Sequence, residues 1–198
     1  MAENAATTRP AAEARPVRSA RRRDDRDRWT ALVLGAALVA MTFVAGLCFT
    51  FSVAVMPALA DADDPTFVAT MQRFNDNPVF PITFTAALLV TALAAVVQRR
   101  HGPGPAVRWT VAALVLHGIV LAVTFGLHLP LNNDIDDAGD PVHAADIAEV
   151  RDDVEAPWVV GNIPRTLLST AAVAALGRAL LLHGRSTTDP TPAGILHP

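Results

Sequence analysis

The chain alternates long apolar stretches with short polar ones. Four stretches carry few or no charged residues over the length that crosses a bilayer, about 20 residues. They run from Trp29 to Leu59, Pro78 to Val97, Trp109 to Leu131 and Ile163 to Leu182. The pattern predicts an all-α integral membrane protein with four transmembrane helices.

The first apolar stretch also has features of a secretory signal peptide. Arginines precede it, and the small residues of "PALA", residues 57–60, resemble a cleavage site. The apolar core of a signal peptide spans only about 7–15 residues, and this stretch is about twice the upper limit. We therefore expect a retained transmembrane helix.

The loop after the first stretch carries the pattern of a short amphipathic helix. Asp64 can cap this helix and Pro65 suits its first turn. Phe67, Met71 and Phe74 then share one face, because they are spaced at i, i+4 and i+7. Such a helix either lies on the membrane surface or forms a lid over the bundle.

The loop after the third stretch has a similar but weaker pattern. Asp140 and Pro141 are expected to begin a short helix, with an apolar stripe of Ala144, Ile147 and Val154. The membrane stretches also contain many small residues, which let helices approach closely in lipid. The predicted architecture is an antiparallel four-helix bundle with a short amphipathic helix in each outer loop.

Charge gives the orientation. All 16 basic residues are arginines, and 13 of them lie in the N-terminal tail, the middle loop and the C-terminal end. Cytoplasmic segments carry such an excess, so we expect a plasma-membrane protein with both termini in the cytoplasm. Residues 1–28 should be a disordered basic tail, 29–183 the transmembrane domain and 184–198 a second disordered tail. The expected partner is the lipid bilayer. Nucleic acid is not expected, because aspartates interrupt the arginines, and no sequence feature indicates an oligomeric state.

The sequence gives little support for a metal or cofactor. The single cysteine, Cys48, excludes an internal disulfide framework and a cysteine-based metal cluster. His117 and His128 lie 11 residues apart on one predicted helix, but a haem at either would need an opposing axial ligand. The other three stretches contain no internal histidine, and no H-E-x-x-H motif is present. We expect neither a metal nor another cofactor.

Two polar clusters are the candidates for chemistry, because ionisable residues inside a membrane are costly. His128 and Asn132 share a helical face if the helix continues through Pro130. Trp158, Asn162 and Arg165 are spaced at i, i+4 and i+7. The third stretch ends and the fourth begins on the outer side, so both clusters lie at one depth.

Each polar residue also has a purely structural interpretation. His128 would then bond to backbone at the interface, and Asn132 and Asn133 would turn the chain after Pro130. Arg165 would extend to the headgroups. However, the sequence places Arg165 in the first turn of the fourth helix, where its positive charge lies at the positive end of the helix dipole. An acidic residue or an anionic ligand would have to offset this repulsion.

Three stretches carry a resemblance to a known family. They are "AGLCFTFSVAVMPALADADDPTFVATMQRFN" (residues 45–75), "LHLPLNN" (127–133) and "PWVVGNIPRTLLSTAAVAAL" (157–176). They resemble the anthrone-oxygenase-like family of small four-helix membrane proteins, many of which have no assigned function. The most specific parts are P-L-N-N at Pro130 and W-x-x-x-N-x-x-R at Trp158, with Gln72 and Asn75 as a further matching pair. One departure is His128, where other members often carry a different polar residue.

The resemblance implies oxidation of an anthrone-like polycyclic aromatic to a quinone by molecular oxygen, without a metal or flavin. His128 would be the base, since its ordinary pKa is near neutral. Arg165, Asn132 and Asn162 would stabilise the oxyanion. The substrate, entering sideways from the bilayer, would contact the following residues: Trp158, Phe125, Asn133, Gln72 and Asn75. The alternative is a non-catalytic membrane protein that binds a small molecule or lipid, or that serves as an accessory subunit.

Overall fold

The computed structural model describes residues 15–100 and 104–188, and within them it contains helices and no strands. Four helical stretches are long and apolar enough to cross a membrane, as predicted. The first consists of α1 (Arg15–Thr50), the π-helical turn η1 (Phe51–Val55) and α2 (Met56–Ala60). The short α3 (Asp64–Asn75) precedes the second, α4 (Val79–Arg99). The third consists of α5 (Pro105–Val123), η2 (Thr124–His128) and α6 (Leu129–Asp137), and the fourth is α7 (Ile147–Thr188).

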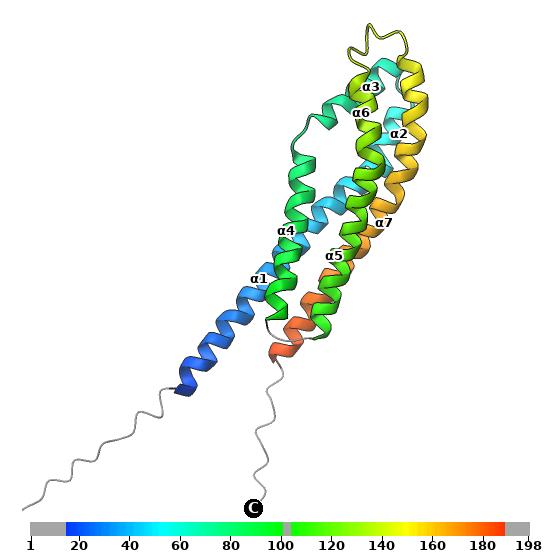
Figure 1. The fold of residues 1–198 in the computed structure, drawn as a ribbon. Coiled ribbons are helices and arrows are strands. Elements are labelled where there is room, and N and C mark those ends of the chain that lie inside the picture. The colour runs from blue at the N-terminus through cyan, green and yellow to red at the C-terminus, as the bar shows by residue number, and fades with distance from the viewer. Residues whose placement is uncertain (1–14, 101–103, 189–198) are drawn as a thin grey trace, which may run out of the picture.

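These helices form the predicted antiparallel bundle (Figure 1). Helix α7 packs between α1 and α5, and α4 packs on α1 and α5. Many contact positions are alanines, such as Ala37, Ala87, Ala113, Ala172 and Ala179, all fully buried. Without side chains to separate them, the helix backbones approach closely, which favours association in lipid.

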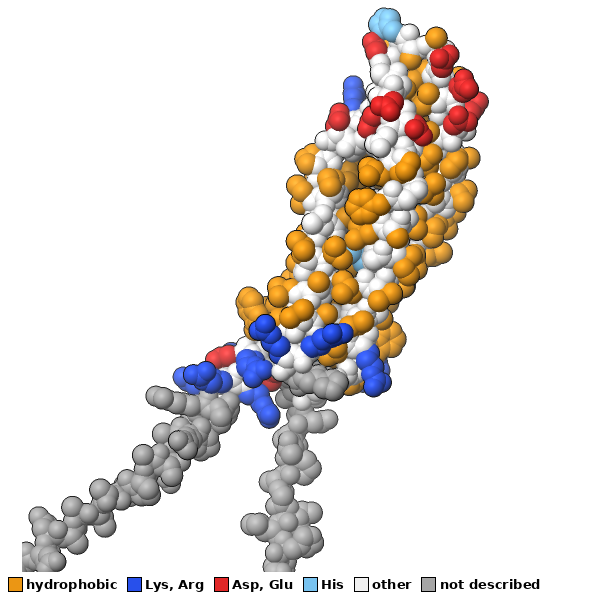
Figure 2. Space-filling model, in the orientation of Figure 1, with side chains coloured by type: hydrophobic (Ala, Val, Ile, Leu, Met, Phe, Trp, Pro, Cys, Tyr) orange, Lys and Arg blue, Asp and Glu red, His pale blue; other side chains and the backbone are white. Residues whose placement is uncertain are grey.

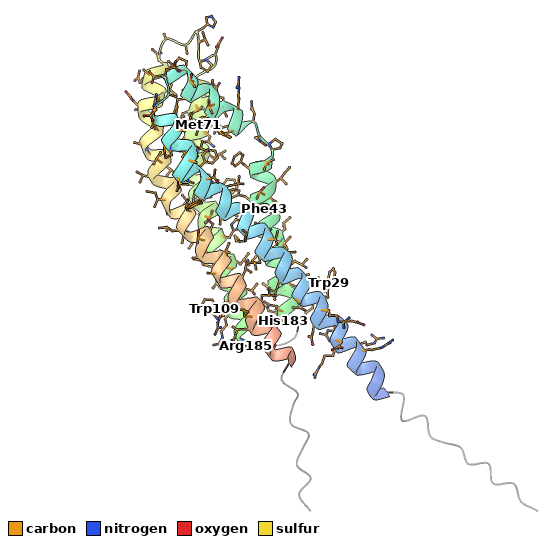
Figure 3. All side chains as sticks on the ribbon, turned by 180° about the vertical axis from the view of Figure 1, so that it is seen from behind. Trp29, Phe43, Met71, Trp109, His183 and Arg185 are labelled. Atoms are coloured by element: carbon orange, nitrogen blue, oxygen red, sulfur yellow. The ribbon has the colours of Figure 1, made fainter. Side chains whose placement is uncertain are left out.

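The surface matches a membrane protein. Apolar side chains cover the middle of the bundle, arginines gather at one end and acidic residues at the other (Figure 2). We call these the arginine end and the acidic end. Trp29 and Trp109 lie toward the arginine end with Arg185, and Met71 lies toward the acidic end (Figure 3). This is the separation of charge that the sequence predicts.

The first loop at the acidic end contains the predicted amphipathic helix, α3. Phe67 and Met71 are fully buried beneath it. The predicted cap, Asp64, is wrong by one position: Asp63 has extended backbone and its side chain accepts a hydrogen bond from the Thr66 N–H at 2.9 Å. Asp64 instead occupies the first turn of the helix, where a carboxylate favours the positive end of the dipole.

The second loop contains no separate helix, contrary to the prediction. Gly139 takes a left-handed conformation with φ of 70°, which ends α6. The Asp140 side chain then accepts a hydrogen bond from the Val142 N–H and closes a turn instead of beginning a helix. Ile147 and Val154 belong to α7, which begins at Ile147 and continues without a break.

Several predicted boundaries are therefore wrong. The fourth transmembrane helix begins 16 residues before Ile163 and contains Pro157 and Pro164. Helix also covers residues 15–28 at the N-terminal end and residues 184–188 at the C-terminal end, both of which were predicted to be disordered. Arginine is a good helix former, so the basic segment extends the helix of the adjoining span. The rest of both predicted tails, residues 1–14 and 189–198, lies outside the described residues.

Candidate ligand pocket near the acidic end

A cavity of about 280 Å³ lies inside the bundle toward the acidic end. This is near the lower end of the range of pockets that hold small organic molecules, roughly 300–1,000 Å³. Helices α1, α3, α4, α5, α6 and α7 and both π-helical turns contribute to its walls. Most of the lining is apolar, and the polar side chains are those of Cys48, Asn75, Thr85, Thr124, His128, Asn132, Asn162 and Arg165.

The helices are irregular at the level of this pocket. In η1 the Met56 N–H bonds to the Phe51 carbonyl, and in η2 the Leu129 N–H bonds to the Thr124 carbonyl, five residues back in each case. Each turn is followed by a proline, Pro57 or Pro130, which has no N–H to donate. Such π-helical turns are frequent at functional sites.

His128 lies at the end of η2 and is only 1% exposed. Its ring meets the edge of the Trp158 ring, with centroids 5.0 Å apart and planes at 74°. The Trp158 indole N–H donates to Asn132 Oδ1 at 2.9 Å. The third and fourth transmembrane helices therefore bring His128, Asn132 and Trp158 together, and the helix does continue through Pro130.

Both ring nitrogens of His128 lack a hydrogen-bond partner among the described residues. A buried polar group without a partner costs about 1–3 kcal/mol. A neutral imidazole has one donor and one acceptor, so it can both take and give a hydrogen bond. The ring is therefore available to a ligand in the cavity.

Asn162 lies inside α7, which begins at Ile147, and it does not cap a helix. Its Nδ2 donates to the Cys48 carbonyl at 2.8 Å and to Ser52 Oγ at 2.9 Å. The carbonyl can only accept, so it fixes the orientation of the Asn162 amide. The remaining Oδ1 is buried and has no partner in the described part of the chain. Asn162 therefore offers a ligand an acceptor and no donor.

Arg165 is also inside α7, so its predicted position in a first turn is wrong. It is 8% exposed, and its guanidinium carbon lies 5.4 Å from the centre of the Phe84 ring. The Cys48 thiol is close by. Across residues 15–100 and 104–188, no carboxylate pairs with this side chain, and its Nε has no hydrogen-bond partner. A buried cation without a counter-ion is costly and attracts a ligand atom that carries negative charge.

Gln72 and Asn75 hold α3 on α6. Gln72 donates to the carbonyls of Ile135 and Gly139 at 3.0 and 2.9 Å. Asn75 donates to the Asn132 carbonyl at 3.1 Å and to Asp136 Oδ1 at 3.0 Å. Asn75 lines the pocket, whereas Gln72 does not. The helix α3 therefore covers the acidic end of the pocket.

The remaining predicted contact residues divide in the same way. Phe125 lines the pocket and is exposed on its outer side, whereas Asn133 is exposed and lies outside the lining. His117 is also outside the lining; its Nε2 lies 3.1 Å from the Phe84 carbonyl. Over the described residues, no group of three or more His, Cys, Asp or Glu side chains could hold a metal ion.

The first transmembrane helix contributes residues that the sequence reasoning missed. Phe51 packs against Phe74 and Trp158, with ring centroids 4.9 and 5.2 Å away. Ser52 accepts from Asn162 and also pairs with Thr166 at 3.1 Å. Ser52 is a polar residue within an apolar run, and that was the available signal. Nothing in the sequence showed that this face of the helix points to the fourth.

The fold defines a small multi-pass membrane protein, and the described residues enclose a cavity inside its bundle. The sequence model described as anthrone oxygenase matches residues 71–175, which is more than half of the chain. The protein belongs to the anthrone oxygenase family. The matched region contains His128, Asn132, Trp158, Asn162 and Arg165 and excludes α1. No curated protein and no solved structure matched the chain.

Proposed function

We propose that this protein is an oxygenase that converts an anthrone-like polycyclic aromatic to a quinone with molecular oxygen. The observation that carries the proposal is the pairing of two buried groups, the uncompensated Arg165 and the unbonded His128, on one cavity. The aromatic rings of Phe51, Phe74 and Trp158 line the same cavity and suit a flat apolar ligand.

The proposed reaction begins with removal of a proton from the methylene carbon opposite the ketone. The resulting enolate is delocalised over the rings and adds oxygen at that carbon, which gives a hydroperoxide after protonation. Loss of water from the hydroperoxide forms the second carbonyl. One oxygen atom enters the quinone, and the other leaves as water with the two hydrogens of the methylene group. The enolate supplies the electrons, so this sequence uses no cofactor.

The residue roles follow from which atoms are free. His128 accepts the proton, since its ring nitrogens have no other partner. Arg165 donates to the enolate oxygen, where negative charge develops. The Oδ1 of Asn132 is held by Trp158, which leaves its Nδ2 as a second donor. Asn162 cannot stabilise an oxyanion because its amide hydrogens are already used; it would orient a ligand hydroxyl instead.

The cellular setting is part of the proposal. The arginine end faces the cytoplasm and the pocket lies toward the opposite face of the plasma membrane. Trp158 and Phe125 would contact the aromatic rings of the ligand. Gln72 would contribute by holding α3 over the pocket. Asn133 is exposed and outside the pocket lining, so its position does not support a contact with the ligand.

Oxygen consumption by the purified protein in lipid vesicles tests the proposal, with anthrone as the substrate. The unsubstituted protein should accelerate uptake, and Arg165→Met should lower kcat by about 100-fold, as loss of one oxyanion donor does. Arg178→Met, in the same helix but outside the pocket lining, is the matched control and should retain full activity. His128→Asn should also lose most of the activity.

The alternative function predicts a different result in the same experiment. A binding protein or accessory subunit would bind anthrone or lipid, or co-purify with a partner, without consuming oxygen. Absence of turnover by the folded protein would therefore reject the oxygenase. Normal turnover by both Arg165→Met and His128→Asn would reject the proposed residues.

A further inference from the structure

The pocket has an opening whose rim is formed by two helices. Most lining residues are buried or half-buried, and the four exposed ones are Pro81 and Thr85 on α4 and Phe125 and Leu129 on η2 and α6. Each pair is spaced at i and i+4, so its members lie above one another on one helix face. The exposed rim therefore follows the edges of α4 and of the η2–α6 segment.

The structure also explains why a gap remains at this place. Helix α4 packs on α1 and α5 and makes no extensive contact with η2, α6 or α7. Beyond the α4–α5 contact, the two edges separate toward the acidic end (Figure 1). The rim residues belong to the spans Val79–Arg99 and Pro105–Asp137, which are long and apolar enough to cross a membrane. We therefore expect the opening to face the hydrocarbon of the bilayer.

The route from water is closed by α3. Three residues of α3 line the pocket. Met71 is 1% exposed, and Phe74 and Asn75 are half-buried. The hydrogen bonds of Gln72 and Asn75 fix α3 to α6 at three points and to Gly139, just after α6, at a fourth. A ligand from water would have to break these bonds, whereas a ligand in lipid meets an apolar opening.

We infer that the pocket exchanges its ligand directly with the membrane through the α4–η2 opening, which we call the lateral portal. This rests on the proposed function only in taking the cavity as the ligand site. The ligand class is an uncharged molecule that dissolves in the bilayer, and a product of similar polarity leaves by the same route. Phe125, 64% exposed and without a ring contact to another described aromatic residue, is the side chain that moves to admit it.

The natural chain contains its own reporter for this route. Cys48 is the single cysteine, it lines the pocket, and it is 2% exposed. In vesicles, N-phenylmaleimide, which partitions into lipid, should label Cys48 at least tenfold faster than a sulfonated, membrane-impermeant maleimide. The reference is Cys48→Ala with Asn133→Cys, whose exposed thiol should react readily with the sulfonated reagent.

Substitutions at the rim test the position of the portal. Thr85→Trp should slow labelling of Cys48 by N-phenylmaleimide at least tenfold, and Phe125→Ala should accelerate it. Leu89→Trp, one turn further along α4 and exposed outside the pocket, should have no effect. Circular dichroism confirms that each variant is helical, and anthrone added to the vesicles should protect Cys48.

Three results would overturn the portal: equal labelling by both reagents, labelling by neither, or a rate that neither Thr85→Trp nor Phe125→Ala alters. Labelling requires no turnover, so the portal and the oxygenase fail separately. Rim-dependent labelling without oxygen consumption would retain the portal and reject the oxygenase. Oxygen consumption with labelling by the sulfonated reagent would do the reverse.

Discussion

The substitution Gly161→Ala, which adds a single methyl group, should lower the activity much more than the stability of the fold. Gly161 is buried where α7 crosses η2. A Cβ at this position would overlap Leu127 Cδ2 and lie 3.0 Å from His128 Cε1. Ordinary contacts begin at 3.4 Å, so in Gly161→Ala the imidazole must retreat by about 0.4 Å or more.

This displacement has a predictable size of effect. Catalytic groups must be held within about 0.5 Å of the productive position, and an error of about 1 Å can cost roughly 100-fold in rate. We expect kcat for anthrone oxidation to fall about 10- to 100-fold. Stability should change less, because alanine gains about 1 kcal/mol in helix propensity and overpacking costs about 1–3 kcal/mol.

The assay is oxygen consumption in vesicles beside thermal unfolding followed by circular dichroism. Gly118→Ala and Gly126→Ala are matched controls, since a Cβ at either glycine meets nothing within 4 Å. Adding Leu127→Ala to Gly161→Ala relieves the leucine overlap and should restore stability without restoring the rate. A stable Gly161→Ala protein that oxidises anthrone as fast as Gly118→Ala would refute the idea that this glycine positions His128.

Three further predictions concern stability, measured by thermal unfolding in detergent. Arg151→Ala removes hydrogen bonds to the carbonyls of Leu59, Ala60 and Ala62 at the end of α2 and should cost about 2–4 kcal/mol; a loss below 0.5 kcal/mol would contradict this. Asn162→Ala removes the hydrogen bonds from α7 to the Cys48 carbonyl and to Ser52 Oγ and should cost about 1–3 kcal/mol, with an unchanged midpoint as the contrary result. Hydrogen bonds from Thr66 lower the pKa of Asp63, so its cap stabilises α3 above the ordinary aspartate pKa and the benefit disappears as pH falls through the folded-state pKa. The difference in midpoint between the natural protein and Asp63→Ala should therefore shrink in acid, and a constant difference would argue against the cap.

The sequence was sufficient for the spans and for part of the pocket. Transmembrane helices depend on length and composition, which are local properties, so four spans and their alternating direction could be predicted. Direction then placed His128 and Asn132 at the same depth as Trp158. The structure brings these three side chains into contact, which the sequence reasoning left open.

The errors have a common physical cause, which is that tertiary packing overrides local signals. Pro157 and Pro164 each remove a hydrogen-bond donor and would normally begin or break a helix. Here α7 contacts α1, α3, α5 and α6, and these contacts keep the helix continuous. The contribution of Cys48 and Ser52 could not be predicted for a related reason, since composition does not fix how an apolar helix is rotated in its bundle.

The residues of the family motifs differ in whether their hydrogen-bonding atoms are already used within the protein. The Trp158 indole N–H is used by Asn132, and both amide hydrogens of Asn162 are used by α1. Gln72 and Asn75 are occupied with α6. Most of the motif therefore assembles the pocket, and a substitution in it should act first on folding. His128 and Arg165 are buried ionisable residues of the lining, and each has at least one nitrogen atom without a partner in the described part of the chain, so we expect substitutions at these two positions to act on the proposed reaction.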